Sequence, residues 1–141
     1  MLGGSRSYFP SEKKAPNRQQ RIERDGESIP EESLGYLTDA FTREGVRYIE
    51  ERDSEKPLLL FMSYTAPHGP MHARPDLLER FASIKDRRRA KYAAMVTCLD
   101  DGVGQLRRAL DAEGIANDTF IVFLLDNGGD PTNARGTGSV R

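Results

Sequence analysis

Two short apolar runs dominate the hydrophobic pattern of the chain. Residues 58–64 and 120–125 are each continuous rather than alternating, and breaker residues or polar residues bound both. Short, unbroken apolar runs are typical of strands that are buried on both faces, as in parallel sheets. The pattern therefore predicts strands over about 57–64 and 119–125.

A stretch with helical periodicity lies between the two runs. It predicts a long helix over about 86–113, with Gly114 well suited to the position just after its end. Shorter helices are predicted over about 38–52, with Thr38 as N-cap, and over about 75–81, with Pro75 in the first turn. The large apolar side chains of the long helix recur at spacings of 4, 3, 4, 3 and 4 and are Tyr92, Val96, Leu99, Val103, Leu106 and Leu110.

Strand, helix and strand in this order form a βαβ unit, whose crossover is expected to be right-handed. The carboxyl ends of parallel strands share one edge of the sheet, and open α/β sheets bind their ligands there. The first run leads into a Pro-His-Gly-Pro turn that contains His68, and the second leads directly into Asp126 and Asn127. The pattern alone thus predicts that these three side chains lie on the same side of an α/β sheet.

Each of these polar positions also has a structural alternative. A single histidine after a strand often serves only as a hydrogen-bonding group, and Asp126-Asn127-Gly suits a turn with positive φ. The turn would need a following strand to form a hairpin, and residues 130–141 do not have the pattern of one. His72 follows His68 by four residues, but Pro70 between them argues against the helix that a two-histidine zinc pair needs.

Composition and charge narrow the classes of function. The chain has 141 residues, which predicts one domain, and its net charge of −1 gives no overall attraction to nucleic acid or to an anionic membrane. No apolar run approaches the ~20 residues that span a bilayer. The first residues lack the apolar region of a signal peptide, so none is expected here. A single cysteine, Cys98, excludes an internal disulfide framework.

The chain divides into three unequal parts. Residues 1–36 are polar and rich in breakers, which predicts a loop segment, with disorder as an alternative. Basic side chains in this segment alternate with acidic ones, which favours a solvated loop over a phosphate or sulfate site. Residues 37–129 hold the predicted helices and strands. Residues 130–141 are predicted to form an irregular tail.

Several sequence blocks, in order, resemble the middle of a sulfatase of the arylsulfatase type. The resemblance covers residues 35–129, and residues 3–9 are similar to a loop that such enzymes carry just before this region. It implies a partial alkaline-phosphatase-like α/β sheet with a βαβ unit and flanking helices, within a partial sulfatase catalytic domain over 37–129. The blocks are Tyr36-Leu37-Thr38-Asp39, residues 57–70, Tyr92-Ala93-Ala94-Met95-Val96, residues 99–104, and Asp126-Asn127-Gly128-Gly129.

The resemblance implies a sulfuric ester hydrolase, which cleaves an aryl or carbohydrate sulfate ester to an alcohol and inorganic sulfate. His68 matches the histidine that contacts the sulfate and helps to protonate the leaving oxygen, and an imidazole suits that role because its pKa lies near neutrality. Asp126 and Asn127 match two ligands of the family's divalent cation, usually Ca²⁺, whose preferred donors are such oxygens. The family is usually exported to the periplasm, the extracellular space or the lysosome.

The sequence also departs from the family pattern. The family's nucleophile is a formylglycine made from the cysteine of a C-x-P-S-R motif, whereas Cys98 lies in Thr-Cys-Leu-Asp-Asp. The family's N-terminal aspartate pair and the lysine-and-histidine motif of its sulfate pocket are not in the sequence either. We therefore expect an internal fragment that is inactive alone and binds Ca²⁺ weakly, because Ca²⁺ takes about 6–8 oxygens. A non-catalytic remnant, or a phosphodiesterase or phosphonate hydrolase of the same superfamily, remains an alternative.

Overall fold

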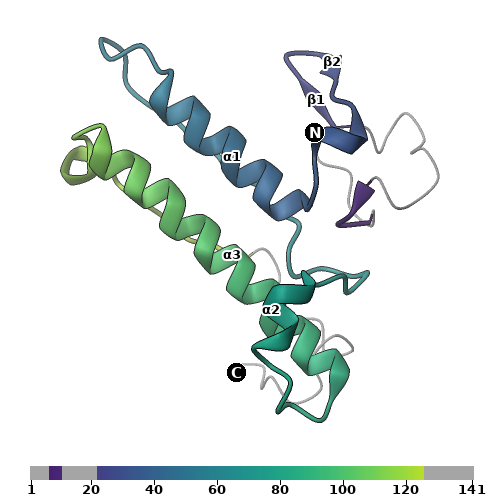
Figure 1. The fold of residues 1–141 in the computed structure, drawn as a ribbon. Helices are drawn as coiled ribbons and strands as arrows, with labels where there is room; N and C mark the ends of the chain where they lie inside the picture. The colour runs from purple at the N-terminus through teal and green to yellow at the C-terminus, as the bar shows by residue number, and fades with distance from the viewer. Residues whose placement is uncertain (1–6, 11–21, 126–141) are drawn as a thin grey trace.

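Two long helices organise the part of the chain that the computed structural model describes, residues 7–10 and 22–125 (Figure 1). A small hairpin precedes the first long helix, and a short helix precedes the second. In chain order the elements are β1 (Glu23–Arg24), β2 (Glu27–Ser28), the 3₁₀ turn η3 (Glu31–Ser33), α1 (Leu37–Glu50), α2 (Pro75–Glu79), α3 (Arg87–Ala112) and the 3₁₀ turn η4 (Ala116–Asp118).

Helices α1 and α3 lie side by side and run in the same direction (Figure 1). Their contacts advance together along the two sequences. Near the start of α1, Asp39 accepts a hydrogen bond from Cys98 of α3 at 3.2 Å. Just beyond the two C-terminal ends, Arg52 and Glu113 form an ion pair at 2.6 Å. A parallel helix pair needs a returning segment between its members, and residues 57–64 provide it.

Two glycines allow the helices to approach closely. A Cβ atom added to Gly102 of α3 would lie 2.6 Å from the Oγ1 of Thr42, and one added to Gly45 of α1 would lie 2.7 Å from the Cδ2 of Leu106. Both distances are well inside van der Waals contact, so any larger residue would push the helices apart or displace these side chains. The glycines are therefore a packing requirement of the α1–α3 interface.

The buried face of α3 differs from the predicted stripe of large residues. Leu99 and Leu110 are buried as predicted, but Val96 is 38% exposed. The difference has a physical reason: small side chains occupy the line of closest approach to α1, so several large ones lie at its flanks. The buried residues of α3 are Ala90, Ala94, Met95, Cys98, Leu99, Gly102, Ala109 and Leu110.

The ends of the long helix follow the sequence signals closely. Asp86 is its N-cap and accepts hydrogen bonds from the backbone N–H groups of Arg88 and Arg89, and Gly114 follows the helix with a φ of 71°. The predicted N-cap of α1 is wrong: the helix begins at Leu37, and Thr38 is buried within its first turn. Helix α2 ends at Glu79, earlier than predicted.

Residues 57–64 run back along the two helices with a strand-like alternation of exposure. Leu58 and Leu60 pack against the cluster formed by the C-terminal halves of α1 and α3. Leu59 and Phe61 point the other way and are 87% and 86% exposed. The helices thus cover one face of this segment, as they would cover one face of a sheet.

The two predicted strands are nevertheless not observed as paired strands. Within the described residues neither 57–64 nor 119–125 makes ladder hydrogen bonds, and the sheet found there is the antiparallel β1–β2 pair, with Glu23 opposite Ser28. A strand is defined by a neighbour that accepts and donates its backbone hydrogen bonds. Every side chain of residues 120–125 is at least 57% exposed. Both segments are as apolar as strands that are buried on both faces. The described residues, however, provide no neighbouring strand to pair with them and no element that packs on their exposed faces.

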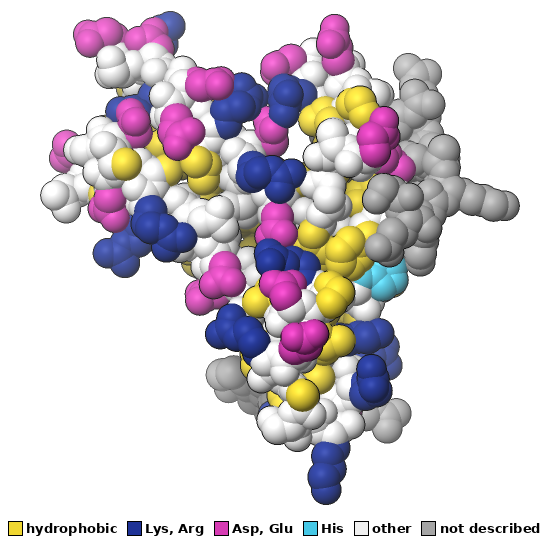
Figure 2. Space-filling model, viewed as in Figure 1, with side chains coloured by type: hydrophobic (Ala, Val, Ile, Leu, Met, Phe, Trp, Pro, Cys, Tyr) yellow, Lys and Arg dark blue, Asp and Glu magenta, His cyan; other side chains and the backbone are white. Residues whose placement is uncertain are grey.

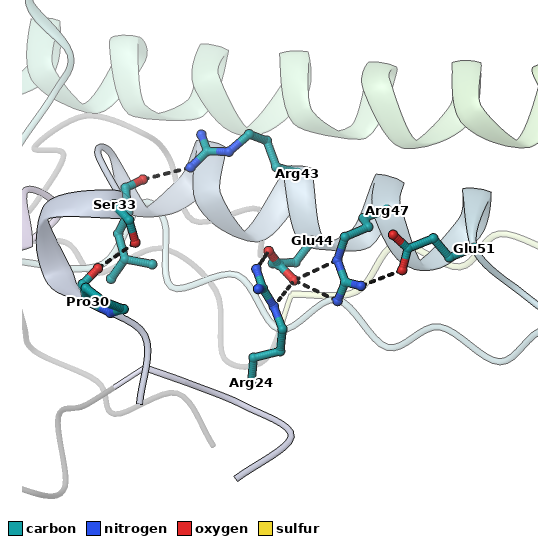
Figure 3. Close-up of polar contacts among 8 residues, drawn as sticks. Arg24, Pro30, Ser33, Arg43, Glu44, Arg47 and Glu51 are labelled. Carbon is teal, nitrogen blue, oxygen red and sulfur yellow. Dashed lines mark hydrogen bonds and ion pairs between the residues drawn. The ribbon is translucent and has the colours of Figure 1, made fainter. Parts of the chain in front are cut away.

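An ion pair attaches the hairpin to α1. Glu44 of α1 accepts hydrogen bonds from Arg24 of β1 and from Arg47, and Arg43 donates to the carbonyl oxygen of Leu34 at 2.9 Å (Figure 3). Exposed pairs of this kind contribute little to stability individually. Figure 2 shows acidic and basic side chains interspersed over this face of the molecule. In the part of the chain that is described, no helix is both long and apolar enough to cross a membrane.

Candidate functional site

His68 lies in a tight turn that directly follows residues 57–64. Its backbone N–H donates to the carbonyl oxygen of Thr65 at 2.9 Å, and its side chain is exposed. The Nδ1 atom lies 2.7 Å from the carbonyl oxygen of Gly69. Because a carbonyl oxygen can only accept, Nδ1 carries the proton, and Nε2 is the acceptor nitrogen of the neutral ring. Nε2 is therefore the nitrogen that can exchange a proton with a ligand.

Tyr8 fastens this turn from outside it. Its hydroxyl lies 2.7 Å from the carbonyl oxygen of Thr65 and 3.0 Å from that of His68, so its single proton lies between two acceptors and is shared by them. The ring is 2% exposed, and burial raises the pKa of Tyr8 to about 12, against the opposing effect of the two hydrogen bonds. The phenol therefore keeps its proton and remains a donor at neutral pH.

Tyr36 continues the same contact. Its ring stacks on Tyr8 with the centroids 5.6 Å apart, and its hydroxyl donates to the carbonyl oxygen of His72 at 2.9 Å. Ser7 adds a third link, because its Oγ lies 3.3 Å from the Nδ1 of His72. We call Tyr8 and Tyr36 the tyrosine clamp, because their hydroxyls hold both ends of residues 65–72.

A second polar cluster lies where α1, α3 and the start of α2 meet. Arg74 donates from Nη1 to Asp39 at 3.0 Å, and from Nε and Nη2 to the two oxygens of Asp76 at 3.1 and 2.6 Å. The hydrogen bonds to Asp76 are the largest cause of a raised pKa of Arg74, so the guanidinium stays charged. The cluster is a network of one guanidinium and two carboxylates that joins three helices.

Cys98 belongs to this network, and its surroundings disfavour the thiolate form. Its side chain is 2% exposed, and burial together with the neighbouring Asp39 raises the pKa of the thiol to about 12. Reactive cysteines have the opposite properties: a lowered pKa and access to solvent. Cys98 is thus a buried, small residue of the core.

The predicted metal ligands Asp126 and Asn127 lie outside the described residues, immediately after Leu125. Their shared edge with His68 therefore stays a prediction. Within residues 7–10 and 22–125 no three or more His, Cys, Asp or Glu side chains are grouped to hold a metal ion. A carboxylate and an amide oxygen fit a hard divalent cation by their chemistry, but two side chains supply only part of its coordination shell.

Comparison with known proteins places the chain in the sulfatase family, whose sequence model matches residues 3–139. The chain is 36% identical over 97 residues to Arylsulfatase J of Mus musculus, a match that covers 69% of this chain and 16% of the relative. It is 34% identical over 113 residues to a sulfatase of Formosa agariphila, covering 70% of this chain and 20% of the relative. The chain thus spans about a sixth to a fifth of the length of these two relatives.

A solved structure shows the fold class. The crystal structure of Ps i-CgsB in complex with k-i-k-neocarrahexaose is 31% identical in sequence and superposes with a TM-score of 0.69. The match covers 80% of this chain and 28% of that chain. The described residues are therefore part of an alkaline-phosphatase-like α/β fold, as predicted.

The sequence pattern did not assign a role to Tyr8, Tyr36 or the Asp39–Arg74 pair. Both tyrosines lie in blocks that carry the sulfatase resemblance, within residues 3–9 and 36–39. Those blocks are the signal that could have pointed to them. Nothing in their spacing, however, indicates that two rings far apart in the sequence stack and grip one turn.

Proposed function

We propose that this chain contributes the acid and part of the metal site of a sulfuric ester hydrolase. The observation that carries the proposal is the 2.7 Å contact between the Nδ1 of His68 and the carbonyl oxygen of Gly69, from which the Nδ1–H tautomer follows, in a chain of the sulfatase family. When a sulfatase cleaves the S–O bond of its substrate, the leaving group is an alkoxide or phenoxide that must be protonated. The imidazolium form of His68, protonated at Nε2, is suited to supply that proton.

His68 would perform two tasks in turn. As the charged form it would attract the anionic sulfate ester and donate a hydrogen bond from Nε2 to the bridging oxygen. As a nucleophile forms its bond to sulfur and the ester S–O bond breaks, the proton would move from Nε2 to the leaving oxygen and release the alcohol, so the neutral ring keeps its proton on Nδ1. Because Gly69 already accepts from Nδ1, this neutral product state needs no rotation of the ring.

Asp126 and Asn127 would hold the family's divalent cation, with Ca²⁺ as our proposal. When bound, the cation would supply charge neutralisation for the sulfate oxygens. The 141 residues contain no C-x-P-S-R motif, and Cys98 is buried with a raised thiol pKa. We therefore propose that the 141-residue polypeptide alone does not turn over sulfate esters.

The test compares two variants in a sulfatase that contains this chain together with a C-x-P-S-R motif. His68→Ala is expected to lower kcat for an aryl sulfate by about 10²–10⁴-fold while leaving Ca²⁺ affinity unchanged. Asp126→Ala is expected to weaken Ca²⁺ binding and activity together. A His68→Ala enzyme with the activity of the unsubstituted enzyme would disprove the assignment.

Two further assays separate the alternatives. The 141-residue polypeptide should give no turnover of an aryl sulfate above buffer, and turnover that survives Cys98→Ser would contradict our view of the nucleophile. A complete enzyme that cleaves a phosphate diester or phosphonate ester faster than a sulfate ester would favour the other branch of the superfamily. A complete enzyme that cleaves neither would favour a non-catalytic remnant.

A further inference from the structure

Tyr8 contacts the turn that contains His68 through backbone carbonyl oxygens rather than through the His68 side chain. Tyr8 reaches the carbonyl oxygens of Thr65 and His68, which are the first and last residues of the hydrogen-bonded part of the turn. The Nδ1 of His68 meets the very next carbonyl, that of Gly69. The direction of the His68 carbonyl therefore sets the peptide plane that leads into the acceptor of Nδ1.

We propose that Tyr8 is a positioning residue for His68: its hydroxyl fixes the peptide planes of the turn so that Nδ1–H donates to Gly69 and Nε2 is left for substrate. This role deepens the proposed function and rests on it for its catalytic meaning. Three observations support it. The hydroxyl is within 3.0 Å of both carbonyl oxygens, the ring is almost fully buried, and stacking on Tyr36 fixes the ring plane.

The buried ring makes the arrangement more than a surface contact. Its burial keeps the phenol protonated, so the donor persists through the pH range in which imidazoles titrate. The backbone N–H of Leu37 also donates to the carbonyl oxygen of Tyr8 at 2.9 Å, which ties the clamp to the first turn of α1. The position of the turn is thereby fixed relative to the α1–α3 helix pair.

The decisive measurement is the tautomer of His68 in the full 141-residue chain. Magic-angle-spinning ¹⁵N spectra report which ring nitrogen carries the proton and tolerate self-association of the sample. Spectra are taken at mildly alkaline pH, where imidazoles are neutral. His68→Gln, which removes the signals of this ring, assigns them. We expect the Nδ1–H tautomer in the unsubstituted chain, and a predominantly Nε2–H ring would overturn the proposal.

Tyr8→Phe keeps the stacked ring and removes only the hydroxyl. The ratio of Nδ1–H to Nε2–H tautomers of His68 is then expected to fall about threefold to tenfold, the effect of one or two lost hydrogen bonds. Tyr64→Phe is the matched control, because it also removes a partly buried hydroxyl, the one bonded to Thr42 at 2.8 Å, without touching a carbonyl of the turn. An unchanged ratio in Tyr8→Phe, or an equal fall in both variants, would overturn the proposal.

A second measurement needs no substitution, so it can test the contact between Tyr8 and the turn even if Tyr8→Phe does not fold. Through-space ¹³C correlations between Cζ of Tyr8 and the carbonyl carbons of Thr65 and His68 are expected in the unsubstituted chain, and their absence would overturn the proposal. Failure here is separate from failure of the proposed function. The tautomer can be independent of Tyr8 while His68 remains the acid, and His68 can prove dispensable for activity while Tyr8 still sets its tautomer.

Discussion

The thiol of Cys98 on α3 donates to the carboxylate of Asp39 on α1, with sulfur and oxygen 3.2 Å apart. The other carboxylate oxygen of Asp39 accepts from Arg74. The α1–α3 interface is therefore polar near the N-terminal end of the helix pair. Further along the pair, it is formed by glycines and by apolar side chains such as Leu106. Burial is the main reason why the pKa of the Cys98 thiol is raised, and the Asp39 carboxylate adds to it, because a negative charge beside a thiol opposes its ionisation.

The first prediction concerns the reactivity of Cys98. An aromatic disulfide reagent at pH 8 should modify the folded chain at least about 100-fold more slowly than a free cysteine, because the thiol is buried and its pKa is raised to about 12. Asp39→Asn should lower the midpoint of the pH dependence of that reaction, because it removes the carboxylate charge. Asp100→Asn is the control: Asp100 lies on an exposed face of α3, the helix that carries Cys98, and its substitution should leave the midpoint unchanged.

The second prediction concerns alkaline pH. The pKa of Cys98 rises from 9.0 to about 12 on folding and that of Tyr8 from 10.0 to about 12. Above about pH 9 the unfolded chain therefore loses protons that the folded chain keeps, so the free energy of unfolding should fall as pH rises toward 12. Urea unfolding at pH 7, 9 and 10.5 measures this slope, which Cys98→Ala should reduce. A free energy of unfolding that stays constant across this range would contradict both raised pKa values.

The third prediction uses two glycines of α3 that differ in their surroundings. Gly102→Ala should destabilise the chain by about 1–3 kcal/mol, because the new methyl group would meet the Oγ1 of Thr42 at 2.6 Å. Gly104→Ala meets only the far end of Arg108, at 3.4 Å, and should stabilise the helix by about 0.5–1 kcal/mol. Denaturant midpoints of the two variants provide the measurement. Equal effects would show that α1 does not approach Gly102 as closely as described.

The sequence predicted the helices better than the sheet. Asp86 and Gly114 mark the ends of α3 by local chemistry, and that chemistry acts whatever surrounds the helix. The burial of α3 was harder to predict, because a periodic pattern of large residues does not reveal that a partner helix approaches along Cys98 and Gly102. Close approach is a property of two helices together, and neither sequence pattern contains it alone.

The site shows the same division. His68 was predicted from its place after an apolar run and from the family resemblance, and both signals are local. The clamp was not predicted, since it joins Tyr8 to a turn 57 residues later through backbone carbonyls. Carbonyl acceptors are present at every residue, so a sequence cannot indicate which of them a distant hydroxyl will reach. Asp126 and Asn127 lie outside the described residues, and their place beside His68 stays a prediction.

The last prediction concerns the two faces of residues 57–64. Leu60 packs against the core formed by α1 and α3, so Leu60→Ala should lower the free energy of unfolding by about 1–2 kcal/mol. Leu59 is 87% exposed, so Leu59→Ala should change the free energy of unfolding by less than about 0.5 kcal/mol.

Self-association should instead depend on the exposed face of residues 57–64. Leu59 and Phe61 present apolar surface on a segment without ladder partners in the described chain, and such surfaces favour self-association. Leu59→Lys combined with Phe61→Lys should therefore shift sedimentation toward the monomer, whereas Leu60→Ala should not. An unsubstituted chain that sediments as a monomer and unfolds in one sharp transition would show that this face needs no cover.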